Sequence, residues 1–159
     1  METEIRQAIY ELRPPALDSL GLMPALHEYA DRFRRLVGFV YGVSCLGVAR
    51  RLPIETEIAV YRIVQEALHN VARHADATRA EVLLDFRGPN LVVTVSDNGC
   101  GFDSDEVLAQ NTRHLGLISM RERAQAVQGE FRLMARPGQG TRVVLTVPMF
   151  QQPHPVEEE

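Results

Sequence analysis

The first group of residues that could perform chemistry lies in a segment with helical periodicity. Glu66 and Asn70 are four positions apart, so their side chains share one face of the predicted helix, one turn apart. Both present oxygen atoms, and Mg²⁺ in proteins takes a few hard oxygen ligands while phosphates and water complete its shell. Arg73 and His74, one turn further on, could reach phosphate oxygens. Taken alone, this pattern is more typical of a solvated helix face.

A second group follows an apolar run. Residues 91–95 (Leu-Val-Val-Thr-Val) read as a buried strand, and Ser-Asp-Asn-Gly-Cys-Gly-Phe-Asp comes directly after it at 96–103. Asp97 lies where the strand ends, so its carboxylate can accept a hydrogen bond from a ligand amine. Gly99 and Gly101 permit backbone conformations and close approaches that a Cβ forbids. The same pattern is equally typical of a tight Asp-Asn-Gly turn.

Two further glycine motifs follow downstream. Gly116 marks the start of a predicted helix, whose first backbone N–H groups are unpaired and attract anions. A P-loop does not explain this motif, because the pattern G-x-x-x-x-G-K-[ST] is missing. Gly138 and Gly140 form a predicted turn, and Thr141 opens a strand with a hydroxyl able to hydrogen-bond. The plain alternatives are a loop-to-helix junction and a hairpin turn.

These residues are positioned by an alternation of helices and hairpins. Pro53 is predicted to open the longest helix, and Gly88-Pro89-Asn90 to join two strands as a hairpin. The other expected elements are a helix ending at Pro14-Pro15, a turn at 17–22, helices at 23–37 and 115–128, and strands at 39–46, 80–86, 90–97, 129–136 and 141–148. This order predicts an α+β two-layer sandwich, with a mixed, mainly antiparallel sheet covered on one face by about three helices.

Composition limits the class of protein. The 159 residues are 45% hydrophobic and 24% charged, which is typical of one globular domain. A formal net charge of −4 argues against a dedicated nucleic-acid binder. No apolar run reaches the roughly 20 residues that cross a bilayer. Cys45 and Cys100 fit no metal-ligand spacing and no disulfide framework, so we expect a cytoplasmic domain, whose parent protein could be membrane-anchored.

The order of these motifs along the chain resembles that of a known protein family. E-x-x-x-N-x-x-R-H, D-x-G-x-G, a Gly-Leu helix start and G-x-G-T follow one another along the chain. Together they resemble the ATP-binding domain of sensor histidine kinases, in the GHKL group with its Bergerat fold that includes the gyrase, Hsp90 and MutL ATPases. The stretches ELRPPALDSLGL, EALHNVARHADA and HLGLISMRERA look like the subfamily paired with LuxR-type response regulators. The likeness runs from about residue 4 to Pro148.

The resemblance implies a role for individual residues. Asp97 would accept the exocyclic amine of adenine, with help from Thr141, Asn70 would hold Mg²⁺, and Glu66 would be the catalytic acid–base group. Residues 103–113 would form a lid hinged toward Gly116. The full ATP-binding set implied is Asn70, Arg73, His74, Asp97, Gly99, Gly101, His114, Leu115, Gly116, Leu117, Gly140 and Thr141.

The resemblance also implies a division of the chain. Residues 1–20 would be the end of a dimerisation helix and a linker, 21–149 the ATP-binding catalytic domain, and 150–159 a disordered acidic tail. A complete histidine kinase carries its phosphoacceptor histidine upstream of the Glu-Leu-Arg-Pro segment at 11–14. The chain is therefore expected to be a catalytic fragment that lacks this histidine, and Met1 need not be the natural start. His27, His69 and His114 are not expected to be the acceptor.

The expected function is Mg-ATP binding and transfer of the γ-phosphoryl group to a histidine on the dimerisation domain, for relay to an aspartate of a LuxR-type response regulator. The expected partners are ATP and ADP, that dimerisation-and-phosphoacceptor domain and the regulator. The parent would be a homodimer, with no direct contact to nucleic acid and no membrane segment in this fragment. Two alternatives stay open: a GHKL-type serine kinase or ATPase, and a nucleotide-sensing module without transfer activity.

Overall fold

The computed structural model describes residues 14–36, 40–103 and 115–150 of the chain. The predicted N-terminal helix and the acidic tail lie outside these ranges, apart from their innermost residues. Of the predicted lid, only Asp103 is described. These expectations therefore stay predictions.

Five strands form a single sheet in the order β1-β2-β3-β5-β4. They are β1 (Val40–Leu46), β2 (Arg79–Asp85), β3 (Asn90–Asp97), β4 (Glu130–Ala135) and β5 (Thr141–Pro148). β1 and β2 are parallel, because a helix crosses over between them, and the neighbouring pairs β2–β3, β3–β5 and β5–β4 are antiparallel. The prediction of a mixed, mainly antiparallel sheet is confirmed.

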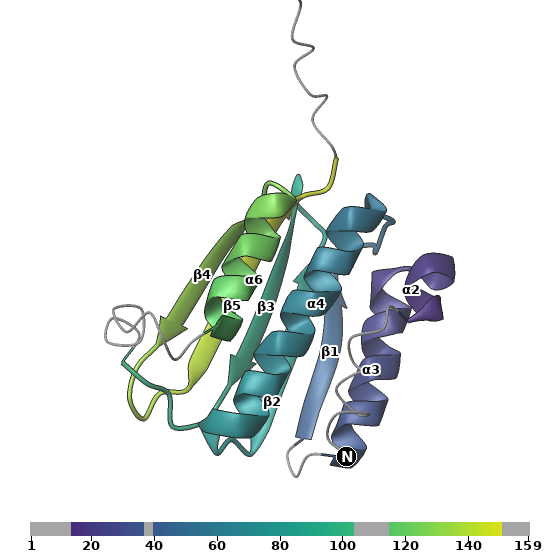
Figure 1. Ribbon diagram of the computed structural model, residues 1–159. Coiled ribbons are helices and arrows are strands. Elements are labelled where there is room, and N and C mark those ends of the chain that lie inside the picture. Colours follow the sequence, from purple (N-terminus) through teal and green to yellow (C-terminus); the bar gives the residue numbers. More distant parts are fainter. Residues whose placement is uncertain (1–13, 37–39, 104–114, 151–159) are drawn as a thin grey trace, which may run out of the picture.

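Three long helices lie side by side across one face of this sheet (Figure 1). They are α3 (Leu22–Leu36), α4 (Ile54–Asn70) and α6 (Leu115–Ala126), so the two-layer arrangement is also confirmed. α4 starts after Pro53, as predicted, and continues into a short π-helical turn, η1 (Val71–Ala75). None of the helices in the described ranges combines the length and apolar character that a membrane span would need.

The core lies between the sheet and these helices. Successive side chains of a strand point to opposite faces, and the alternate residues that face the helices are buried. In β3 these are Leu91, Val93 and Val95. One side of α4 is buried as well, through Tyr61, Val64, Leu68 and Val71 at steps of three and four, with Ile58 half-buried. α3 buries one side too, through Leu26, Tyr29, Ala30 and Phe33.

The turn predicted at 17–22 is wrong, because Pro15–Leu20 forms a short helix, α2. Pro15 stands in its first turn, where a missing N–H costs no helical hydrogen bond. Leu17 is fully buried, and α2 packs against α3 and α4. Gly21, with φ +91°, ends the helix. Prolines that were predicted to stop a helix therefore stand at the start of one, and tertiary burial stabilises it.

We expect Leu17→Ala to lower the free energy of unfolding by about 2–5 kcal/mol, because the side chain is fully buried. Leu20, in the same helix, is 64% exposed, and Leu20→Ala should change stability by less than about 0.5 kcal/mol. Denaturant unfolding of the two variants measures the difference. Equal small effects would contradict the docking of α2 on the domain.

Candidate functional site

A carboxylate stands at the tip of the central strand. Asp97 is the last residue of β3 and is half-buried. Its Oδ1 accepts the backbone N–H of Gly99 at 2.8 Å, and the carboxylate also accepts the backbone N–H of Thr141. Burial raises the pKa of Asp97, and these two hydrogen bonds oppose the rise. Two backbone donors therefore fix the orientation of the side chain.

Two loops meet at this tip with their backbones in contact. Gly101 and Gly140 have φ angles of +60° and +73°, a region that favours glycine. A Cβ on Gly140 would overlap the carbonyl oxygen of Asp97, and one on Gly101 would overlap that of Arg136. The packing of the protein itself thus requires both glycines. The resemblance placed Gly101 and Gly140 in the ATP-binding set, but the sequence did not predict this contact between the two loops.

Asn98, which the sequence analysis did not single out, ties the strand tip to the start of β2. Its Oδ1 accepts the backbone N–H groups of Thr78 and Arg79 at 3.0 and 2.9 Å. Its Nδ2 donates to the Thr78 hydroxyl at 2.8 Å. No local pattern reveals this role, because asparagine in a turn ordinarily bonds backbone groups close to it in sequence, whereas Thr78 and Arg79 are 20 and 19 positions away.

The end of α4 lies at the same end of the sheet. α4 runs into η1 and then into β2, whose residue Ala80 pairs with Asp97 of β3 (Figure 1). Glu66 and Asn70 are half-buried and one turn apart, as predicted. A Cβ on Gly116, in the first turn of α6, would overlap Oε1 of Glu66. Glu66 therefore packs directly against the backbone that starts α6.

His69 lies between these two residues in sequence but packs toward α3. Its ring stacks on Phe33, with centroids 5.7 Å apart and planes inclined by 13°. Burial lowers the pKa of His69, while Glu66 raises it and Arg73 lowers it. The His69 ring is thus part of the contact between α3 and α4.

The structure brings most of the predicted site residues into two clusters. Asp97, Gly99, Gly101, Gly140 and Thr141 form the first, and Glu66 with Gly116 forms the second. Among the remaining predicted residues, Asn70 is one turn from Glu66, Arg73 is exposed on η1 and Leu117 is half-buried against the core. His114 and the side chains of His74 and Leu115 lie outside the described part of the chain.

The comparisons with known proteins agree on one family. Residues 55–151 match the family described as histidine kinase-, DNA gyrase B-, and HSP90-like ATPase. The signal transduction histidine-protein kinase/phosphatase DegS of Brevibacillus brevis is 36% identical over 146 residues, which are 92% of this chain and 37% of that protein. The oxygen sensor histidine kinase NreB of Staphylococcus carnosus is 36% identical over 146 residues, 92% of this chain and 42% of that protein.

A solved structure agrees in fold. The histidine kinase domain of the Erythrobacter litoralis EL346 blue-light activated histidine kinase superposes with a TM-score of 0.62 at 28% identity, over 78% of this chain and 59% of that one. The chain belongs to the histidine kinase-, DNA gyrase B-, and HSP90-like ATPase family, and its fold is that of a histidine kinase ATP-binding domain. The resemblance inferred from the four motifs is confirmed. The chain spans only 37% and 42% of the length of DegS and NreB.

The raised pKa of Asp97 predicts a pH-dependent cost in stability. The folded protein binds the Asp97 proton more tightly than the unfolded chain, so ionised Asp97 destabilises the fold above its folded pKa. This cost disappears as the pH falls toward the ordinary value of 3.8. We expect Asp97→Asn to raise the free energy of unfolding at about pH 8, with a gain that shrinks by about pH 4.

Asp85 provides a control of opposite sign, because Arg87 lowers its pKa. Asp85→Asn should lose stability near neutral pH, and that loss should largely remain at about pH 4 and shrink only below 3.8, as the pH falls through the lowered pKa of Asp85. Denaturant unfolding at both pH values measures each difference. If Asp97→Asn changed the free energy of unfolding equally at both pH values, or lowered it as Asp85→Asn should, the raised pKa of Asp97 would be contradicted.

Proposed function

We propose that this chain binds Mg-ATP and transfers the γ-phosphoryl group to a histidine on a dimerisation domain. The observation that carries the proposal is the Asp97 carboxylate, held by two backbone N–H groups at a strand tip beside glycine loops. Membership of an ATPase family supports ATP as the ligand. We also propose residues 21–149 as the catalytic domain, after a dimerisation-helix end and linker at 1–20 and before a disordered acidic tail at 150–159.

Asp97 recognises the adenine base in this proposal. An ionised carboxylate only accepts hydrogen bonds, so it suits the exocyclic amine of adenine and disfavours a carbonyl at the same position. Thr141 assists directly or through water. Gly99, Gly101 and Gly140 present backbone without side chains along the same edge.

The end of α4 and the start of α6 serve the phosphates. Asn70 offers the oxygen ligand for Mg²⁺, which supplies charge neutralisation on the phosphate oxygens when bound. In this proposal Arg73 and His74 would contact the phosphates, and His114 would belong to the lid of the ATP site. Leu115, Gly116 and Leu117 bring the backbone N–H groups of the helix start to the same place.

Glu66 acts as the acid–base group of the transfer. An imidazole nitrogen of the acceptor histidine attacks the γ-phosphorus, a nitrogen–phosphorus bond forms and the bond to the leaving ADP oxygen breaks. The carboxylate of Glu66 polarises this nucleophile and accepts its proton. Contact of Glu66 with the start of α6 supports the role, because it places the carboxylate beside the proposed phosphate end.

The acceptor passes the phosphoryl group to an aspartate of a response regulator of the LuxR type. The parent protein is proposed to be a homodimer through its dimerisation helices, with this domain in the cytoplasm whether or not the parent is anchored to a membrane. The local forms ELRPPALDSLGL and HLGLISMRERA support this choice of partner. A serine kinase, a bare ATPase and a nucleotide-sensing module are the competing functions.

The decisive experiment mixes this chain with a separately produced dimerisation domain of its parent and γ-labelled ATP. We expect acid-labile, base-stable label on histidine that depends on added Mg²⁺. Glu66→Gln should keep nucleotide binding and slow transfer by roughly 100-fold or more. Label on serine, release of free phosphate alone, or ATP binding without any label would each support one of the competing functions and contradict the kinase.

A further inference from the structure

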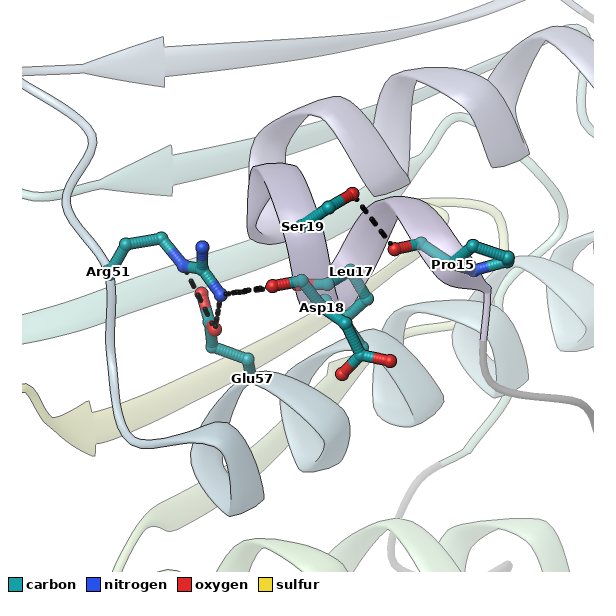
Figure 2. A network of polar contacts seen from close by, with 6 residues as sticks. All are labelled: Pro15, Leu17, Asp18, Ser19, Arg51 and Glu57. Carbon is teal, nitrogen blue, oxygen red and sulfur yellow. Dashed lines mark hydrogen bonds and ion pairs between the residues drawn. The ribbon is translucent and has the colours of Figure 1, made fainter.

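Arg51, in the loop after β1, joins two helices from different parts of the chain (Figure 2). Its Nε and Nη2 donate to Oε1 of Glu57 at 3.3 and 3.2 Å. The same Nη2 reaches the carbonyl oxygens of Leu17 and Asp18 at 3.4 and 3.1 Å. Glu57 lies in the first turn of α4, whereas Leu17 and Asp18 belong to α2. One guanidinium therefore bonds both helices, and we name these bonds the Arg51 clasp.

The two charges of the clasp are unequally exposed. The Glu57 side chain is 0% exposed and that of Arg51 is 52% exposed. Within the described residues, Oε2 of Glu57 has no hydrogen-bond partner. A buried carboxylate is costly unless a cation pairs with it, and the last carbonyls of a helix lack partners within the helix. Arg51 meets both needs at once.

Gly21 leaves room for the guanidinium where the chain turns from α2 into α3. A Cβ at this position would lie 2.9 Å from Cδ and 3.1 Å from Nε of Arg51. The N–H of Gly21 donates to the carbonyl oxygen of Ala16 at 3.1 Å, which closes α2. The end of α2 is thus shaped around the clasp.

The clasp and the proposed site lie at opposite ends of α4. Glu66 and Asn70 follow Glu57 by 9 and 13 positions (66 − 57 and 70 − 57). At 1.5 Å per residue they are about 14 and 20 Å further along the helix. α2 directly follows the Glu-Leu-Arg-Pro segment at 11–14, the proposed exit from the dimerisation helix.

We propose that Arg51 is a positioning residue, which locks α2 onto α4 and so holds the incoming dimerisation helix in a fixed relation to the helix that carries Glu66. This inference rests on the proposed transfer function. Loss of the clasp loosens α2 and slows phosphoryl transfer, whereas ATP affinity is unchanged because the nucleotide site is at the far end of α4. The proposed domain boundary then moves from residue 20 to just before Pro15.

Hydrogen exchange in this chain tests the docking of α2. Arg51→Ala should raise the exchange rate of amides 16–21 by roughly tenfold or more, because charge-assisted hydrogen bonds are lost. Arg50→Ala is the matched control, because Arg50 is the residue next to Arg51 and its exposed side chain has no part in the clasp. Unchanged exchange in Arg51→Ala, or an equal rise in Arg50→Ala, would overturn the clasp.

A double variant separates positioning from stability. Arg51→Ala alone leaves a buried carboxylate without its cation, and adding Glu57→Gln removes that charge. We expect the double variant to recover part of the lost melting temperature while the exchange at 16–21 stays fast. If exchange slows again together with the recovery, Arg51 has only a stabilising role.

Transfer is measured in a chain extended upstream through the dimerisation helix. We expect Arg51→Ala to lower the transfer rate about fivefold or more, with ATP affinity within about twofold of the parent, and Arg51→Lys to retain part of the rate. Arg50→Ala should match the parent. If Arg51→Ala leaves the transfer rate unchanged, or weakens ATP binding by the same factor as it slows transfer, the positioning role is overturned. Either result leaves the proposed function standing. A parent chain that transfers nothing overturns the proposed function as well, while the exchange experiment still decides whether Arg51 holds α2.

Discussion

The site depends on a contact between two stretches of backbone. At the end of the sheet, the loop after β3 and the β4–β5 turn approach so closely that Gly101 and Gly140 have no space for a Cβ. This contact fixes Asp97 relative to Thr141, and the backbone N–H groups of Gly99 and Thr141 then hold the carboxylate. Its orientation is set in the protein alone, which lowers the ordering cost of binding a ligand there.

Helix α4 connects this end of the molecule with the opposite one. Its first turn carries the buried Glu57, which Arg51 joins to α2, and its far end carries Glu66 against the start of α6. Contacts with α2, α3 and α6 hold the helix along its length. A single rigid element therefore links the segment where the chain enters the domain to the proposed phosphate end of the site.

Local patterns predicted most of the fold, because strand alternation, helical stripes and hairpin turns are all encoded within a few residues. α2 was missed because Pro15 is equally suited to stopping one helix and starting another, and only the burial of Leu17 decides between them. In the site, the type and place of Asp97 were evident. The close contact at Gly140 could not be predicted, because the carbonyl oxygen that fills the space beside it belongs to Asp97, which is distant in sequence. Asn98 was missed for the same reason, since its partners are 19 and 20 residues away.

Adenine recognition by Asp97 is tested most directly by comparing two nucleotides. Inosine triphosphate carries a carbonyl oxygen where ATP carries the exocyclic amine, so it presents an acceptor to the Asp97 carboxylate. Calorimetry should show inosine triphosphate binding more weakly than ATP by roughly 10- to 100-fold, and Asp97→Asn should narrow that gap. Equal affinity of the unaltered chain for both nucleotides would contradict the assignment of Asp97 to the base.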